Sequence, residues 1–177
     1  VVALLSVGLL LKWNLGPTER PAAPDGMSAL HFETRHGEQL TQRLADNSVL
    51  HLNTDSAVSI RYSKNERRVT LRSGQASFEV THEANRAFMV HAGSAEVIDL
   101  GTKFDVRLDE GSTVVTVVEG RVAVAPTNPG QSPLLRPVEL TADQQLRVAE
   151  GAWPATPVAI DAKRTTAWMH QQIVFDN

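Results

Sequence analysis

Most of the chain after Leu30 consists of short alternations of apolar and polar residues, separated by turn-forming clusters. Residues 58–62, 76–80 and 104–108 place an apolar side chain at every second position, and the clusters SKNE, HEAN and DEGS follow them. A period of two is that of a half-buried β-strand, and strands at roughly 8 to 12 residue spacing are typical of sandwiches, barrels and solenoids. The pattern predicts an all-β, antiparallel domain that is sandwich-like, jelly-roll-like or solenoid-like, and it excludes a parallel βαβ fold.

Two turns between alternating runs predict tight connections. In RLDEGSTVV and VVEGRV a glycine, Gly111 or Gly120, follows an acidic residue, and glycine can take a positive φ in a tight hairpin. We therefore expect strands over 102–108, 113–118 and 121–125 to form an antiparallel meander. The middle run, TVVTVV, is apolar on both faces, so it should be a central strand covered on both sides.

The carboxyl-terminal part is less regular. A proline-rich break over 126–137 precedes VELTADQQLRV, which predicts two short strands about a turn. Residues 151–177 predict an extended tail with one helical turn at 163–170 and a last strand that begins at Ile173.

The amino end is apolar and uncharged over residues 1–11, and Lys12 and Trp13 follow. A spanning helix needs about 20 apolar residues, and aromatic and basic residues often mark its interface with water. We interpret residues 1–13 as the second half of a transmembrane helix; a signal-peptide core and a buried strand are the alternatives. Residues 14–28 are rich in proline and glycine, which predicts a linker.

Composition and motifs narrow the function. The net charge of −3 and the pI near 6.1 provide no basic surface for nucleic acid, and the absence of cysteine excludes disulfides and thiolate metal sites. No H-x-H or H-E-x-x-H spacing, calcium loop, nucleophile elbow or phosphate loop is present, so we expect no metal and no cofactor. The histidines lie in different predicted elements: His31, His36, His51, His82, His91 and His170. A tethered β domain of this kind is expected to bind or relay rather than to catalyse turnover.

Five sequence blocks resemble the FecR family, and the match is densest over residues 44–124. They are LADNSVLHLNTDSAVSI, VTLRSGQASFEV, RAFMVHAGSAEVIDLGTKFDV, VTVVEGRVAV and LTADQQLRV. Asn47 and Asp143 stand where glycine is usual in the family, and Ala87 stands where proline is usual. Asn also tolerates the left-handed region, so that departure is mild.

The resemblance implies a single-pass inner-membrane regulator with its β domain in the periplasm. Such proteins couple an outer-membrane TonB-dependent transducer to an extracytoplasmic-function sigma factor, typically for iron-uptake genes, and act as anti-sigma factors. On this basis the chain divides into the end of a transmembrane helix (1–13), a linker (14–28), a FecR-like β domain (29–150) and the start of a transducer-contacting segment (151–177). The sigma-binding region would precede Val1.

Partner contacts are expected in the tail. We expect transducer binding to involve Trp168, with a strand containing Ile173, Val174 and Phe175 that adds to a transducer sheet. The alternative function is that of a cell-envelope carbohydrate-binding jelly roll, in which Trp153 and Trp168 would stack on sugars.

Gly101 and Thr102 stand where a strand begins and admit two interpretations. Glycine permits a positive φ at a turn, and β-branched threonine suits the start of a strand. The resemblance adds a second interpretation, because some FecR-like regulators cleave themselves once between glycine and threonine. In that reaction the threonine hydroxyl attacks the preceding carbonyl.

Overall fold

The computed structural model describes residues 29–127, 136–149, 151–153 and 156–170. The predicted transmembrane segment 1–13, the linker 14–28 and the strand at Ile173, Val174 and Phe175 lie outside these residues. Within the described part, no helix has the length and apolar character needed to cross a membrane.

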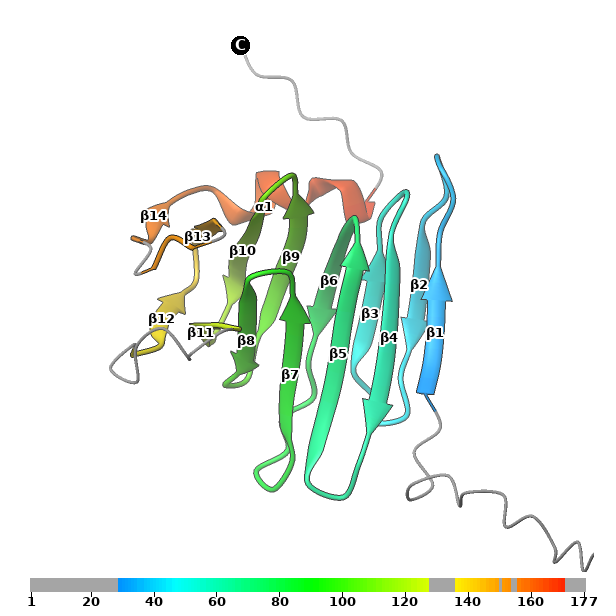
Figure 1. The fold of residues 1–177 in the computed structure, drawn as a ribbon. Coiled ribbons are helices and arrows are strands. Elements are labelled where there is room, and N and C mark those ends of the chain that lie inside the picture. The colour runs from blue at the N-terminus through cyan, green and yellow to red at the C-terminus, as the bar shows by residue number, and fades with distance from the viewer. Residues whose placement is uncertain (1–28, 128–135, 150, 154–155, 171–177) are drawn as a thin grey trace, which may run out of the picture.

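Two sheets of seven described strands lie face to face (Figure 1). Sheet A has the order β1 (Ala29–Glu33), β4 (Ala57–Tyr62), β5 (Glu66–Ser73), β7 (Ala87–Ala92), β8 (Ala95–Asp99), β11 (Arg121–Pro126) and β12 (Val138–Thr141). Sheet B has the order β14 (Val158–Ala159), β13 (Gln144–Ala149), β10 (Ser112–Glu119), β9 (Lys103–Asp109), β6 (Gln75–Glu79), β3 (Val49–Leu52) and β2 (Leu40–Arg43). Every pairing between described strands is antiparallel except β5 with β7. The all-β prediction is confirmed, and the architecture is a sandwich.

The core lies between the two sheets and is built from alternate residues of each strand. Phe78 of β6 belongs to this core, and the centroid of its ring lies 5.7 Å from that of Phe88 of β7 and 5.2 Å from that of Phe104 of β9. These three rings come from both sheets, so the aromatic cluster joins the layers.

The prediction for TVVTVV is confirmed, because β10 lies between β9 and β13 and is buried on both faces. Val115 and Val117 belong to the core between the sheets. Val114 and Thr116 are also buried, on the outer face, where the helical segment α1 (Ala162–Thr165) packs against β10.

The predicted three-strand meander is wrong in its last strand. β9 and β10 form the expected hairpin, but β11 pairs with β8 and β12 in sheet A. After Gly120, which has a φ of +79°, the chain crosses to the opposite layer. Val117 and Val122 both point into the core, and a period of two in the sequence does not distinguish two strands of one sheet from strands of facing sheets. The two strands of VELTADQQLRV, β12 and β13, are likewise in different sheets.

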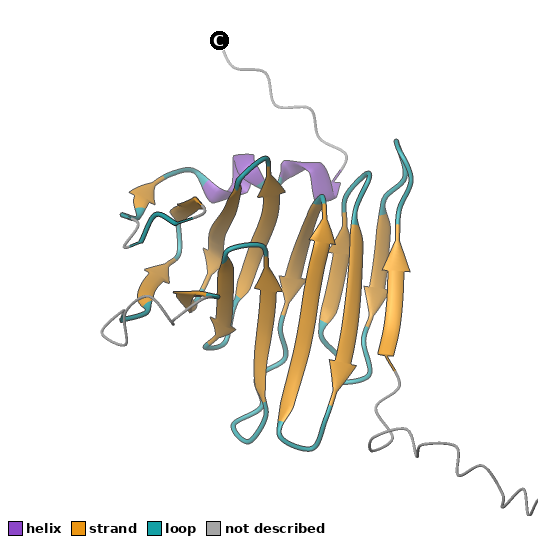
Figure 2. Ribbon diagram, in the orientation of Figure 1, coloured by secondary structure: helices purple, strands orange, loops and turns teal. Residues whose placement is uncertain are grey.

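A segment that we call the C-terminal strap, residues 156–170, begins with the edge strand β14 and then crosses the outer face of sheet B (Figure 2). It contains α1 and the 3-10 helix η2 (Ala167–His170), close to the helical turn expected at 163–170. Asp161 caps α1 by accepting hydrogen bonds from the amides of Lys163 and Arg164. Buried Ala162 and Ala167 anchor the strap to the sheet.

Candidate functional site

Gly101 and Thr102 lie in the short connection that carries the chain from β8 in sheet A to β9 in sheet B. Gly101 is exposed and has a φ of +104°, a conformation that L side chains rarely adopt. Thr102 is 7% exposed, so an exposed glycine precedes a buried hydroxyl residue. Both features expected of the dipeptide as a turn into a strand are therefore present.

The carboxyl group of Asp99 lies beside three polar groups of this turn. Thr102 Oγ1 donates to Asp99 Oδ1. The backbone N–H groups of Gly101 and Thr102 favour the charged form of the Asp99 carboxyl, as amides do when they follow an aspartate in a turn. The hydroxyl and the amide nitrogen of Thr102 thus lie near one acidic group.

The dipeptide Gly101-Thr102 is held from two further sides. The Thr102 carbonyl accepts a hydrogen bond of 3.0 Å from the Val80 amide, just after β6. On the other side the turn at Gly120 presses on the peptide, since a Cβ added at Gly120 would lie 2.2 Å from Gly101 O and 2.9 Å from Thr102 Cγ2. Only a residue without a side chain fits this contact.

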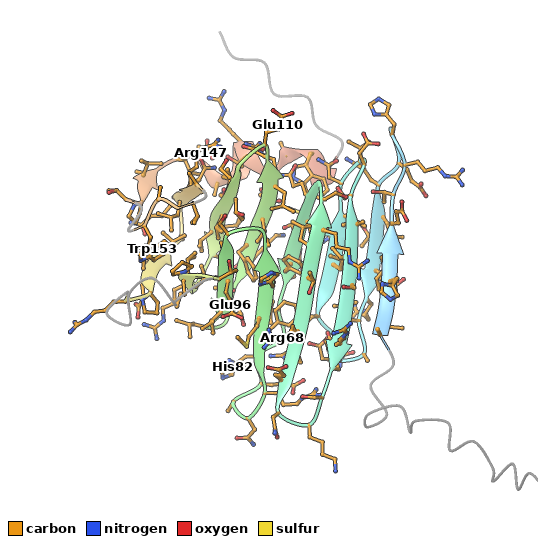
Figure 3. All side chains as sticks on the ribbon, in the orientation of Figure 1. Arg68, His82, Glu96, Glu110, Arg147 and Trp153 are labelled. Atoms are coloured by element: carbon orange, nitrogen blue, oxygen red, sulfur yellow. The ribbon has the colours of Figure 1, made fainter. Side chains whose placement is uncertain are left out.

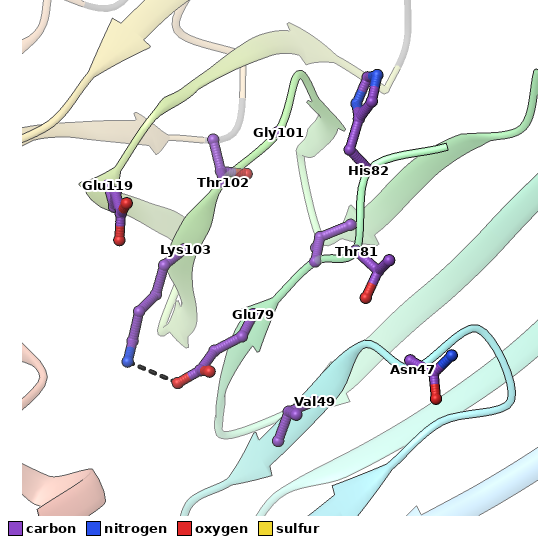
Figure 4. Close-up of a pocket in the computed structure, with 10 residues that line it drawn as sticks. Asn47, Val49, Glu79, Thr81, His82, Gly101, Thr102, Lys103 and Glu119 are labelled. Atoms are coloured by element: carbon purple, nitrogen blue, oxygen red, sulfur yellow. Dashed lines mark hydrogen bonds and ion pairs between the residues drawn. The ribbon is translucent and has the colours of Figure 1, made fainter. Parts of the chain in front are cut away.

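An open hollow of about 450 Å³ gives solvent access to the dipeptide (Figure 4). Lys103 crosses it and pairs with Glu79 at 2.6 Å between Nζ and Oε1. The hollow is lined by Asn47, Val49, Glu79, Val80, Thr81, His82, Gly101, Thr102, Lys103 and Glu119.

The environment makes Asp99 a stronger base than an ordinary aspartate. Burial raises the pKa of the Asp99 carboxyl to about 6, against the opposing effects of the Gly101 and Thr102 amides and of the Arg67 and His82 side chains. At neutral pH the group is therefore ionised, with a proton affinity suited to general base chemistry.

Trp168 lies on the outer face of sheet B, where the strap covers Asp105 of β9. Asp105 is 2% exposed and accepts a hydrogen bond of 2.9 Å from Gln75 Nε2. The indole N–H of Trp168 is buried near this carboxyl group, and the Trp168 carbonyl accepts a hydrogen bond from Gln39 at 3.4 Å. The described part of the expected partner segment thus packs on its own domain.

The contribution of Asp105 to the free energy of unfolding should fall as the pH rises. Burial raises the pKa of its carboxyl to about 7, only partly offset by Gln75, Arg107 and Trp168. The unfolded chain releases this proton near 3.8 and the folded domain only near 7, so between these values ionisation favours unfolding. Urea unfolding should show Asp105→Asn gaining about 3–4 kcal/mol relative to the wild type from pH 4 to pH 7.5.

The quantity to compare is the free energy of unfolding of Asp105→Asn minus that of the wild type at each pH. Carboxyl groups whose pKa is lowered, such as Asp46 and Asp109, contribute with the opposite sign, but they contribute equally to both proteins and so cancel in this difference. Parallel stability curves for wild type and Asp105→Asn would show that the buried group is not linked to folding.

The tryptophans invoked for sugar binding do not form an open platform. Trp153 packs against the hydrophobic core (Figure 3), and Trp168, which is part of the strap, is partly buried. No group of three or more His, Asp or Glu side chains in the described ranges is arranged to hold a metal ion.

Sequence reasoning missed Asp99 and Gly120 as members of the site. The spacing Asp-Leu-Gly-Thr carries a usable signal, because an aspartate two residues before a turn glycine can accept the amides that follow. The approach of Gly120 has no local signal, since it depends on β10 and β11 belonging to different sheets.

The chain is similar to one protein family and to solved structures of the same fold. The family model described as FecR protein matches residues 31–123, which include β8, the Gly101–Thr102 connection and β9. Two crystal structures of a candidate anti-sigma factor from Parabacteroides distasonis, at 2.50 and 1.65 Å resolution, are similar in fold. Their TM-scores are 0.69 and 0.68, each at 25% identity, over 80% and 79% of this chain. The chain spans 65% and 64% of their lengths. No curated protein matches it.

Proposed function

This chain belongs to the FecR family, and from that premise we propose that it is a regulator of a sigma factor. The observation that carries the proposal is the family match over residues 31–123, together with the fold shared with a candidate anti-sigma factor. The enzyme motifs absent from the sequence are consistent with a relay that acts by binding.

The signal would pass from the outer membrane through the β domain to the sigma factor. We propose that the protein is anchored in the inner membrane by residues 1–13 and their preceding sequence, with the β domain in the periplasm. A TonB-dependent outer-membrane transducer, serving iron or siderophore uptake, would contact the strap and its continuation. The sigma factor, of the extracytoplasmic-function class, would bind a cytoplasmic region before Val1.

Transcript profiling of a deletion strain tests the regulatory role. Loss of the gene should change the transcripts controlled by one extracytoplasmic-function sigma factor, and a plasmid copy should restore them. Unchanged transcripts under both iron-replete and iron-poor growth would contradict sigma-factor regulation. A changed set of genes unrelated to iron would contradict only the iron-uptake part.

Topology has its own test. A periplasm-specific reporter fused after Asn177 should be active, and a cytoplasm-specific reporter at the same place should be silent. The reverse result would overturn the periplasmic assignment without affecting sigma-factor binding.

We also propose that the domain cleaves itself once between Gly101 and Thr102. Thr102 Oγ1 attacks the Gly101 carbonyl carbon, the C–N bond breaks, and the amide nitrogen becomes the amine of an ester intermediate. One water molecule opens the ester, which leaves a carboxylate at Gly101, a free amine at Thr102 and the threonine hydroxyl restored. The exposed Gly101 backbone and the open hollow support this proposal by admitting water.

Thr102→Ala should abolish cleavage, because it removes the nucleophile from a position where the hydroxyl contributes one hydrogen bond. Intact-mass measurement of the freshly purified domain should find two fragments in the wild type, which differ from the uncut chain by one water in total. Thr102→Ala should give one uncut mass. Thr102→Ser keeps the hydroxyl and should still cleave, whereas a wild type that stays uncut on long incubation would refute the reaction.

A further inference from the structure

We propose that Asp99 is the catalytic base of the Gly101–Thr102 cleavage, taking the proton from the Thr102 hydroxyl and returning it to the departing Thr102 nitrogen. This inference rests on the self-cleavage part of the proposed function. It assigns to one carboxyl group both proton transfers that the acyl shift requires.

Geometry selects Asp99 among the ionisable groups near the dipeptide. Its Oδ1 accepts the hydrogen bond of the Thr102 hydroxyl, so the proton to be removed already points at it. The other charged groups that line the hollow are placed differently. Lys103 is paired with Glu79, and neither His82 nor the exposed Glu119 makes a hydrogen bond to Thr102 among the described contacts.

The same carboxyl group also lies near the leaving group. The backbone N–H of Thr102 favours the charged form of Asp99, and the Thr102 hydroxyl donates to the same carboxyl group, so the nitrogen that must gain a proton when the C–N bond breaks lies near the group that has just received one. No rearrangement of the turn is needed between the two transfers, and a single carboxyl group can serve first as base and then as acid.

The step balances within the turn. As Oγ1 bonds to the Gly101 carbonyl carbon, its proton passes to Asp99; as the tetrahedral carbon expels the Thr102 nitrogen, the proton passes from Asp99 to that nitrogen. Water then attacks the ester, Asp99 accepts a proton from the water, and the Thr102 oxygen leaves and is reprotonated. Asp99 ends as it began, and one water molecule is consumed.

Neighbouring side chains and burial set the pKa of Asp99. Arg67 of β5 and His82 of the β6–β7 connection are the side chains that act electrostatically on Asp99, and both favour its ionised form. Burial acts in the opposite direction and dominates, so cleavage should accelerate as pH rises through about 6 and level off above neutrality.

Asp99→Asn should slow cleavage by about 100-fold or more, the usual contribution of a positioned general base. Asparagine keeps an oxygen acceptor for the turn amides, so circular dichroism and the melting temperature should stay close to those of the wild type. Cleavage would be followed by intact mass after purification at pH 5 and transfer to buffers from pH 5 to 9. The rise near pH 6 should be present in wild type and absent in Asp99→Asn.

Glu119→Gln is the matched control, because it neutralises a carboxylate of the same hollow and should cleave like the wild type. If Asp99→Asn fails to fold, Asp99→Glu takes its place and should cleave measurably, with a pH dependence that still reports a carboxyl group. Wild-type rate and pH profile in Asp99→Asn, with Thr102→Ala uncut, would overturn the role of Asp99 and leave self-cleavage standing. An uncut wild type would overturn both.

Discussion

Replacing Arg67 by alanine should destabilise the domain by about 3–5 kcal/mol, because it leaves the Asp46 carboxylate buried without its counter-ion. Arg67 is 1% exposed, and its Nη1 lies 2.6 Å from Asp46 Oδ2. The guanidinium also donates to the carbonyls of Thr81 and Arg86 and lies 5.3 Å from the centroid of the Phe88 ring. Its removal would therefore leave several buried acceptors unpaired.

Asp46 is ionised in the folded domain. Burial raises the pKa of its carboxyl, but hydrogen bonds from Ser48, Arg67 and Tyr62 outweigh burial and hold the pKa below its usual value of 3.8. A lowered carboxyl pKa contributes stability above pH 3.8 that is lost as the pH falls. The loss caused by Arg67→Ala should thus be large at pH 7 and smaller in acid.

Arg68→Ala is the control, since the neighbouring side chain points to the outer face of sheet A (Figure 3). Arg68 is 39% exposed and pairs with Glu66 at 3.1 Å and with Glu96 at 3.7 Å. Exposed pairs contribute about 0–1 kcal/mol. Urea unfolding of the two variants at pH 7 measures the difference, and similar losses for both would contradict the importance of the buried ion pair.

Gly120→Ala should cost about 2–5 kcal/mol and should also slow cleavage at Gly101–Thr102. A non-glycine residue at a φ of +79° costs about 1–2 kcal/mol, and forcing atoms into a packed site adds about 1–3 kcal/mol. The new Cβ would overlap Gly101 O, so the reacting carbonyl would have to shift from its position beside the Thr102 hydroxyl. Chemical unfolding gives the first quantity, and the intact-mass time course gives the second.

Gly111→Ala separates the backbone cost from the steric one. Gly111 has a φ of +68°, but an added Cβ there meets no atom within 4 Å. It should lose only about 1–2 kcal/mol and cleave at the wild-type rate. Equal effects of the two substitutions would show that contact with the Gly101 carbonyl is not important.

Alternation along the sequence was sufficient to predict the all-β class and the strands that bury every second residue, such as β5, β7 and β11. It could not assign strands to layers, because a residue that points inward from sheet A and one that points inward from sheet B give the same pattern. This is why β11 was placed beside β10. The parallel pairing of β5 with β7 could not be predicted from the alternation either, because it depends on β6 belonging to the other sheet.

Arg67 and Arg68 illustrate the same limit for side chains. Parity places Arg67 on the face of Val69 and Leu71, which are core residues, yet a charged residue in the core requires a partner. That partner, Asp46, lies 21 residues away in the turn before β3. At the candidate site, the turn at Gly101 was predictable from its own residues, whereas the approach of Gly120 required the three-dimensional path of the chain.

The crossing from β8 to β9 has a mechanical consequence. A cut there leaves residues 29–101 and 102–170 joined, among the described strands, along β8–β11 in sheet A and β6–β9 in sheet B. Each seam holds five residue pairs, from Ala95 to Asp99 of β8 and from Gln75 to Glu79 of β6. Tension between the two ends of the chain would then be carried across these seams by hydrogen bonds and packed side chains. A cut domain would come apart at a load that an uncut domain, with its covalent path intact, would survive.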